Sequence, residues 1–242
     1  MRVLSAVELL DVWERGLTQS PVERALTLLA AACTEASIEA LAQLSIGQRD
    51  GLLLTLREWT FGPQFVSLTT CPTCGERLEL TVDATDLRVE AQPIAESELR
   101  VANYVVHFRL PNSLDLIALS RGEDLTAVPR LLLKRCLLQV RSDGMETSSE
   151  ELPVEVMDAI VARMAETDPQ ADMRLALTCP QCGHQWRAAF DIAAFFWCEI
   201  DAWAERTLRE VHILASRYGW REMDILAMSP RRRQCYLNLV NA

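Results

Sequence analysis

A Cys-Pro-x-Cys-Gly motif occurs twice in the 242-residue chain, at residues 71–75 and again at residues 179–183. A tetrahedral zinc site takes four thiolate or imidazole ligands, and two Cys-x-x-Cys pairs supply a complete set. The proline and glycine of each motif favour the tight turn in which backbone N–H groups point at the sulfurs. The spacing therefore predicts one structural zinc ion per chain, held by Cys71, Cys74, Cys179 and Cys182.

The similarity of the two copies extends beyond the cysteines. In each copy an apolar residue follows the motif, and a short strand-like run then ends at an aspartate, Asp83 in the first copy and Asp191 in the second. The flanking segments, 65–70 with 77–82 and 173–178 with 185–190, are predicted to pair as strands. Two hairpins that face each other across one metal form a zinc ribbon. The sequence therefore predicts a ribbon that is split by a long insert.

Other readings of the cysteines stay open at this point. Cys-x-x-Cys is also the spacing of redox dithiols, although neither motif opens a helix after a strand. A catalytic zinc would keep one coordination position for water, and four cysteines would close it. His184 follows the second motif directly and can replace a sulfur. The other four cysteines lie in mainly apolar stretches and are predicted to be small core residues: Cys33, Cys136, Cys198 and Cys235.

Outside the ribbon, the sequence predicts mainly helix, and hence an α+β fold that is mostly helical. Ser20-Pro21-Val22-Glu23 is a capping box that opens a helix. Apolar residues at three- and four-residue steps predict a long helix over 192–217, which Gly219 ends. We expect an N-terminal helical region (1–62), a first ribbon half (63–90), an α+β insert (91–170), a second ribbon half (171–190) and a C-terminal helical region (191–242), joined as one globular unit.

Within the insert, the pattern predicts one strand over 101–110 and a helix capped by Ser113. A second helix is predicted over 124–140, followed by a hairpin-like turn at Arg141-Ser142-Asp143-Gly144. A third helix is predicted over 153–167. The acidic segment 145–153 is interpreted as a solvated loop.

Composition and missing motifs limit the function. The formal net charge of −10 disfavours the basic surface that binds a nucleic-acid backbone. The sequence contains neither a nucleophile elbow, nor a phosphate loop, nor a zinc-protease or dinucleotide motif, and its three histidines are scattered, so we expect no catalytic residues and no enzyme. The chain also lacks a secretion signal and a membrane-spanning apolar run. A cytoplasmic protein with reduced cysteines is expected.

Three arginines fit poorly with a simple surface helix. Arg231, Arg232 and Arg233 occupy the first turn of the predicted final helix, where the helix dipole disfavours positive charge. Intramolecular pairing with acidic residues, a partner with an acidic face, or nucleic acid would each satisfy them. Trp220 and Tyr236 lie nearby in sequence. These five residues are therefore candidate partner-binding residues, although core packing is the more frequent fate of the two aromatic side chains.

Several segments carry a resemblance to a known family. "HFRLPNSLDL", "DPQADMRLALTCPQCGHQW" and, most specifically, the C-terminal pattern "YGW…ILAMSPRRR…YL" resemble the baseplate hub assembly chaperones of T-even phages. The likeness is greatest to the zinc-ribbon versions encoded in contractile-tail and contractile-injection loci. It implies a non-enzymatic protein that binds a baseplate hub or tube-initiating subunit during assembly. A permanent structural subunit and a zinc-ribbon nucleic-acid module remain the alternatives.

Overall fold

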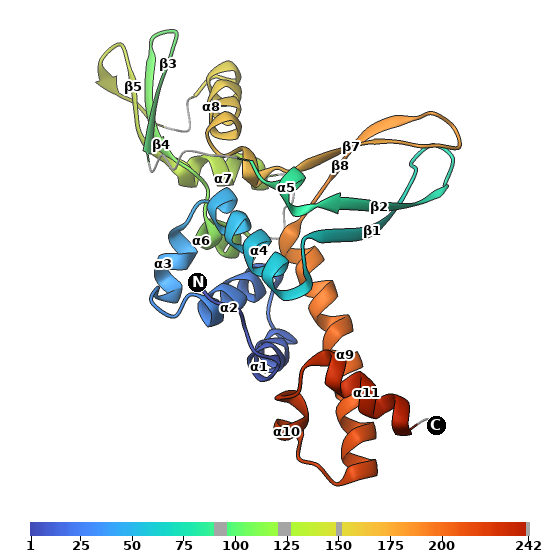
Figure 1. The fold of residues 1–242 in the computed structure, drawn as a ribbon. Coiled ribbons are helices and arrows are strands. Elements are labelled where there is room, and N and C mark those ends of the chain that lie inside the picture. The colour runs from blue at the N-terminus through green and yellow to red at the C-terminus, as the bar shows by residue number, and fades with distance from the viewer. Residues whose placement is uncertain (90–95, 121–126, 149–151, 241–242) are drawn as a thin grey trace. The chain divides into compact units, whose positions relative to one another are not determined.

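The computed structural model describes residues 1–89, 96–120, 127–148 and 152–240 (Figure 1). The fold is α+β and mostly helical, as predicted. The chain packs as two compact units. Unit 1 consists of residues 1–35 and 193–242, and unit 2 consists of residues 36–192. The division of the chain into five segments stays a prediction.

The secondary-structure elements of unit 1, over its described residues, are all helices. Its N-terminal part forms α1 (Ala6–Gly16) and α2 (Pro21–Ala32), and its C-terminal part contains most of α9 (Ile192–Tyr218), then α10 (Glu222–Leu226) and α11 (Pro230–Val240). Both N-terminal helices begin with capping boxes, in which Ser5 pairs with Glu8 and Ser20 with Glu23. These boxes satisfy backbone N–H groups that a helix start leaves unpaired.

The core of unit 1 joins its two chain segments. Leu10 of α1 packs in one cluster with residues of the three C-terminal helices, among them Ala204, Leu214, Ile225 and Leu237. Close packing between α1 and α9 needs a glycine, because a Cβ at Gly16 would meet the Trp197 ring at 2.0 Å. The Nε1–H of Trp13 donates a 2.7 Å hydrogen bond to Asp201. A polar contact thus accompanies the apolar packing.

Unit 2 contains both predicted hairpins. After α3 (Ile38–Gln43) and α4 (Ile46–Phe61), β1 (Gln64–Thr70) pairs with β2 (Arg77–Asp83), which leads into the short α5 (Ala84–Leu87). Later in the chain, β7 (Arg174–Thr178) pairs with β8 (Gln185–Ala189). Both pairs are antiparallel and lie within one residue of the predicted strand bounds.

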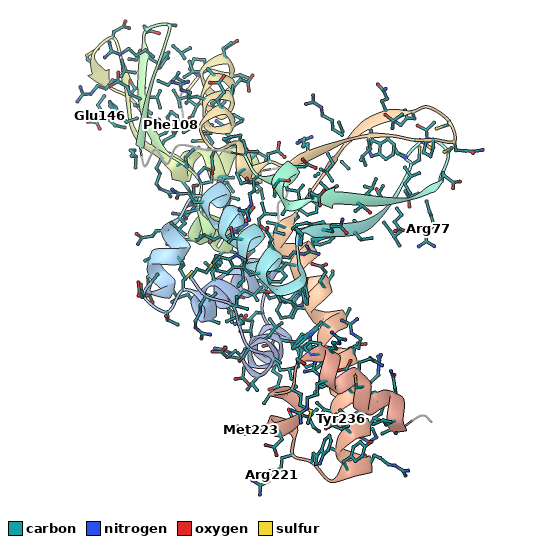
Figure 2. The ribbon with its side chains drawn as sticks, viewed as in Figure 1. Arg77, Phe108, Glu146, Arg221, Met223 and Tyr236 are labelled. Atoms are coloured by element: carbon teal, nitrogen blue, oxygen red, sulfur yellow. The ribbon has the colours of Figure 1, made fainter. Side chains whose placement is uncertain are left out.

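The insert between the hairpins is a second small α+β assembly. Its four strands lie in the order β3 (Glu96–Val101), β4 (Tyr104–Arg109), β5 (Leu137–Ser142) and β6 (Met145–Glu146). Its helices are α6 (Ser113–Leu119), α7 (Val128–Cys136) and α8 (Val154–Thr167), followed by the 3-10 turn η2 (Pro169–Ala171). Phe108 of β4 packs with Val140 of β5 and Ile160 of α8 in the core of this assembly (Figure 2).

Four details of the insert differ from the prediction. The segment 145–153, expected as a solvated loop, begins with β6, in which Met145 and Glu146 pair with β5. The single strand expected over 101–110 is a hairpin, because the chain turns at Ala102, which has a φ of 52°. The helix expected through Val140 ends at Cys136, since Leu137–Ser142 pairs with β4 as β5. Asn112, rather than Ser113, caps α6. The first residues of the helix predicted over 124–140, and residues 149–151 of the predicted loop, lie outside the described residues.

Buried charges connect the elements of unit 2. Asp115 is fully buried and accepts hydrogen bonds from both terminal nitrogens of Arg109, at 2.6 and 2.8 Å, and from Nε of Arg135, at 3.0 Å. Arg49 and Asp50 form a second buried ion pair on α4, at 2.7 Å. Buried charges are tolerated when they are paired and hydrogen-bonded in this way.

Candidate metal centre

Each Cys-Pro-x-Cys-Gly motif folds into a tight loop at the end of its hairpin. In the first loop, the N–H of Cys71 donates to the carbonyl of Glu76 at 2.8 Å, and the N–H of Gly75 donates to the carbonyl of Cys71 at 3.0 Å. The second loop has the two equivalent bonds: the N–H of Cys179 donates to the carbonyl of His184 at 2.8 Å, and the N–H of Gly183 donates to the carbonyl of Cys179 at 2.9 Å. Gly75 and Gly183 have φ values of 76° and 73°, which favour glycine.

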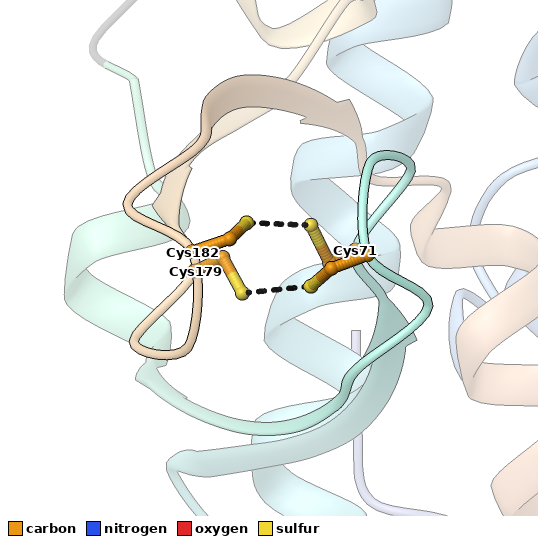
Figure 3. Close-up of side chains that lie close together, drawn as sticks. Cys71, Cys179 and Cys182 are labelled. Carbon is orange, nitrogen blue, oxygen red and sulfur yellow. Dashed lines mark hydrogen bonds between the residues drawn. The ribbon is translucent and has the colours of Figure 1, made fainter.

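The two loops bring their cysteines together (Figure 3). All four sulfurs lie within 4.8 Å of one another. Across the site, Cys71 Sγ lies 3.8 Å from Cys182 Sγ, and Cys74 Sγ lies 3.6 Å from Cys179 Sγ. A tetrahedral zinc ion with Zn–S bonds of about 2.3 Å requires sulfurs about 3.8 Å apart. The four cysteines can therefore hold one metal ion, and their spacing fits zinc.

The same distances bear on the redox alternative. The four cysteines are unbridged, and the two short contacts each join one loop to the other rather than the two cysteines of one motif. A disulfide requires sulfurs about 2.05 Å apart. The arrangement is thus that of a shared site between two hairpins. His184 lies outside the sulfur group found among the described residues, and its ring stacks on Trp186 at 5.8 Å.

The backbone around the cysteines favours thiolates unequally. Burial opposes the thiolate of Cys71, but hydrogen bonds from the N–H groups of Cys74 and Thr73 outweigh it and lower the pKa to about 7. The N–H of Glu76 favours the thiolate of Cys74, but burial and the neighbouring sulfurs raise its pKa to about 12. The pKa of Cys182 is also raised, because burial and the sulfurs of Cys179 and Cys71 outweigh the hydrogen bonds from the His184 N–H and Cys74. The raised pKa values of Cys74 and Cys182 mean that these two thiols keep their protons at neutral pH unless a cation displaces them.

Aromatic side chains join the bases of the two hairpins. Phe65 at the start of β1 and Phe190 after β8 make an edge-to-face contact, with ring centroids 5.9 Å apart. The guanidinium of Arg57, from α4, lies 3.8 Å over the Phe65 ring. The hairpins are therefore held together at one end by aromatic packing and at the other end by the sulfur cluster.

The remaining cysteines divide into two pairs. Cys136 is fully buried, which confirms the core prediction for it, whereas Cys33 is only half-buried. Cys198 and Cys235 are exposed, so the core prediction was wrong for them. Cys198 lies midway between the buried Phe196 and Ile200, and a step of two residues on a helix points to the opposite face.

The predicted partner-binding residues all lie in unit 1, where two of them join an aromatic cluster. Trp220 stacks on Tyr218 at 4.5 Å, and Tyr236 packs edge-on against Trp220 at 4.8 Å. The sequence analysis did not include Tyr218 among the candidate partner-binding residues, although it lies only two positions before Trp220. Both Trp220 and Tyr236 are half-buried and contact the core of unit 1.

The three arginines of α11 do not share one environment. Arg233 is only 3% exposed, and its side chain donates to Glu210 at 3.0 Å and to the carbonyl of Met228 at 2.9 Å. Arg233 is therefore satisfied by pairing within the chain, and it lies inside unit 1 rather than on its surface. Arg231 and Arg232 are exposed, and Arg232 lies 5.8 Å over the Tyr236 ring.

Fold and site together define a class: a mostly helical α+β protein with a four-cysteine centre, of zinc-ribbon type, between two hairpins. The chain belongs to the family of T4 bacteriophage base plate proteins, whose model matches residues 8–197 and so includes both cysteine motifs. No curated protein and no solved structure matches the chain. Over the described residues, no helix has both the length and the apolar character that a membrane span requires.

Proposed function

We propose that this baseplate protein is a non-enzymatic assembly chaperone, or adaptor, for the baseplate hub of a phage-like contractile tail or injection system. The observation that carries the proposal is the base plate family match over residues 8–197. The chaperone role itself is supported by the resemblance of the cysteine motifs and the C-terminal pattern to hub assembly chaperones. The proposed partner is a hub or tube-initiating subunit.

The non-enzymatic part of the proposal rests on the sequence, which lacks the recognisable catalytic motifs of hydrolases, NTPases and dehydrogenases. A four-cysteine site would leave a bound zinc without the open position that catalysis needs. The metal would then stabilise the fold. It would hold the ends of two hairpins together on either side of the insert.

Metal analysis tests the zinc assignment. We expect one zinc per chain in the purified protein, and we expect Cys74→Ser to lower that content sharply because it removes one of four ligands. Cys198→Ser is the matched control, since Cys198 is an exposed thiol outside the cluster. Iron in place of zinc would correct the identity of the metal, and a metal-free native protein would refute the assignment.

For the partner surface, we propose the exposed arginines of α11 together with the aromatic cluster. Arg231 and Arg232 lie on the surface of a chain whose net charge is −10, so they form a local positive region. An acidic face on the partner is the complement that this region favours. Arg233 is not part of this surface, because Glu210 already pairs with it.

A pull-down with the neighbouring tail proteins tests partner and surface together. The wild-type chain is expected to capture a baseplate hub subunit, and Arg231→Ala with Arg232→Ala is expected to weaken that capture about tenfold, more at low salt than at high salt. Arg209→Ala is the control, because Arg209 is an exposed arginine of the same unit that pairs locally with Glu205. Salt-sensitive binding of nucleic acid, without capture of a tail protein, would overturn the proposal.

A permanent baseplate subunit is the second candidate, since the family description of a base plate protein also fits a component that stays. Quantification in purified mature particles separates the two roles. A chaperone is expected to be absent or substoichiometric there. A structural subunit would be present at fixed stoichiometry.

A further inference from the structure

The first hairpin has one edge strand without any charged residue. β1 consists of Gln64, Phe65, Val66, Ser67, Leu68, Thr69 and Thr70, whereas β2 carries Arg77, Glu79 and Asp83. Exposed edge strands normally carry charges or prolines, because an open edge is a template for pairing with another strand. On the outer face of β1, Val66 is 53% exposed and Leu68 is 62% exposed. The strand therefore combines an open edge with apolar surface.

The backbone direction of β1 follows from its register with β2. The N–H of Cys71 donates to the carbonyl of Glu76, which makes these two residues a hydrogen-bonded pair. Two and four residues back along β1, Thr69 lies opposite Leu78 and Ser67 lies opposite Leu80. Hydrogen-bonded and non-hydrogen-bonded pairs alternate along an antiparallel ladder. Ser67 and Thr69 thus bond to β2, and the backbone groups of Val66 and Leu68 point to the opposite edge. No other described strand pairs with that edge.

The second hairpin provides an internal comparison. When Cys71 is aligned with Cys179, the positions of Val66 and Leu68 are occupied in β7 by Arg174 and Ala176. Arg174 is a charged edge residue of the protective kind, and Ala176 presents little apolar surface. The two hairpins thus share one backbone pattern and differ in edge protection. The loss of protection is confined to β1, since β8 also carries a charge at Arg187.

We propose that β1 pairs with β1 of a second copy of this chain, antiparallel and about a two-fold axis at Ser67. This axis sets Val66 opposite Leu68 of the second copy and Gln64 opposite Thr70 of the second copy. All four positions have outward-pointing backbone groups, so the register satisfies the ladder on both strands. The result is a continuous sheet in which the two hairpins lie edge to edge.

The strand's own sequence argues for a second copy as the occupant. A two-fold interface must be self-complementary, and β1 meets this condition because it brings no like charges together and pairs Val with Leu on one face. The charged residues of β2, Arg77, Glu79 and Asp83, lie one strand further from the axis. Self-pairing therefore covers Val66 and Leu68 without burying an unpaired charge.

The internal comparison also supplies the test variant. Val66→Arg with Leu68→Ala gives β1 the residues that β7 already carries in the same backbone setting, so the hairpin is expected to fold. By light scattering coupled to gel filtration, the wild-type chain is expected to have twice the 27.2 kDa chain mass at tens of micromolar, and the variant the single mass. Glu79→Ala, on the same face of β2, is the control and is expected to remain dimeric. Equal metal content in all three proteins verifies the fold.

Hydrogen exchange on the wild-type chain gives a second readout that does not depend on a variant. The amides of Val66 and Leu68 are expected to exchange at least tenfold more slowly at high than at low protein concentration, while the amide of Ser67 is protected at both. A wild-type chain that is monomeric throughout, or a variant that stays dimeric, would overturn the proposal. So would amides of Val66 and Leu68 whose exchange does not depend on concentration.

Discussion

The backbone N–H of Gly47 donates a 2.9 Å hydrogen bond to Oδ2 of Asp168, which lies 121 positions later in the chain. Gly47 is in the first turn of α4, and Asp168 follows α8. A carboxylate at a helix N-terminus pairs with free N–H groups and with the positive end of the helix dipole. Since α4 leads into β1 and Asp168 precedes β7, this bond fixes the bases of the two hairpins relative to each other.

Gly47→Ala is expected to destabilise the protein by about 1–3 kcal/mol, because a Cβ at Gly47 would lie 1.9 Å from Oδ1 of Asp168. Equilibrium urea unfolding measures the change. Gly51→Ala, on the same helix, is the matched control, since no atom lies within 4 Å of its added Cβ. Because alanine has less conformational entropy than glycine to lose when the helix forms, Gly51→Ala should stabilise the folded protein by about 0.5–1 kcal/mol. Equal effects at both positions would contradict the close contact.

Chelation of the metal is expected to loosen the hairpins before the helices. Without a cation the four sulfurs must share protons at close range, so the ends of the hairpins separate and their amides exchange faster. Unit 1 contains no ligand, and its helical circular dichroism is expected to persist. The midpoint of the first thermal transition should fall by about 10 °C. Unchanged hairpin exchange after complete metal removal would argue against a structural role.

Asp115→Asn is expected to cost about 2–3 kcal/mol, because it weakens the charge-assisted hydrogen bonds that a fully buried carboxylate accepts from Arg109 and Arg135, whose own side chains are partly exposed. The amide keeps the size of the carboxylate, so urea unfolding reports the charge rather than a cavity. Asp172→Asn is the control, since its pair with Arg174 is exposed at both ends, and its effect should stay within about 0.5 kcal/mol. Similar losses of unfolding free energy in both variants would show that burial of the carboxylate does not determine how much its ion pairs contribute to stability.

Asp50 gives the protein a pH dependence of a definite sign. Burial raises the pKa of its carboxyl from 3.8 to about 6, although Arg49 acts in the opposite direction. Between about pH 4 and 6 the folded state keeps a proton that the unfolded state has released, so this group's contribution to the unfolding free energy falls as pH rises, by up to about 1.4 kcal/mol per unit. Unfolding of wild type and Asp50→Asn across this window checks the difference in slope. Parallel curves would contradict the raised pKa.

The ribbon was predictable because its signals are local. The two motifs fix the loops through Pro and Gly, and the strands on either side follow from alternation around them. Helices with strong caps, such as the one that Ser20 opens, were predictable for the same reason. Leu137–Ser142 was not, since a short apolar run after a helix suits either structure and only pairing with β4 decides. Arg233 likewise needed the position of Glu210, which lies on a different helix.

The separation of the two cysteine loops sets an order of events during synthesis. Cys71 and Cys182, whose sulfurs lie 3.8 Å apart, are 111 positions apart in the chain. A nascent chain that ends before residue 182 carries only part of the ligand set, so the complete site arises after the whole insert has left the ribosome. The insert is therefore complete, and able to fold, while the ends it separates are still unjoined. Closure of the four-sulfur site then marks the point at which both halves of the ribbon have been made and have met.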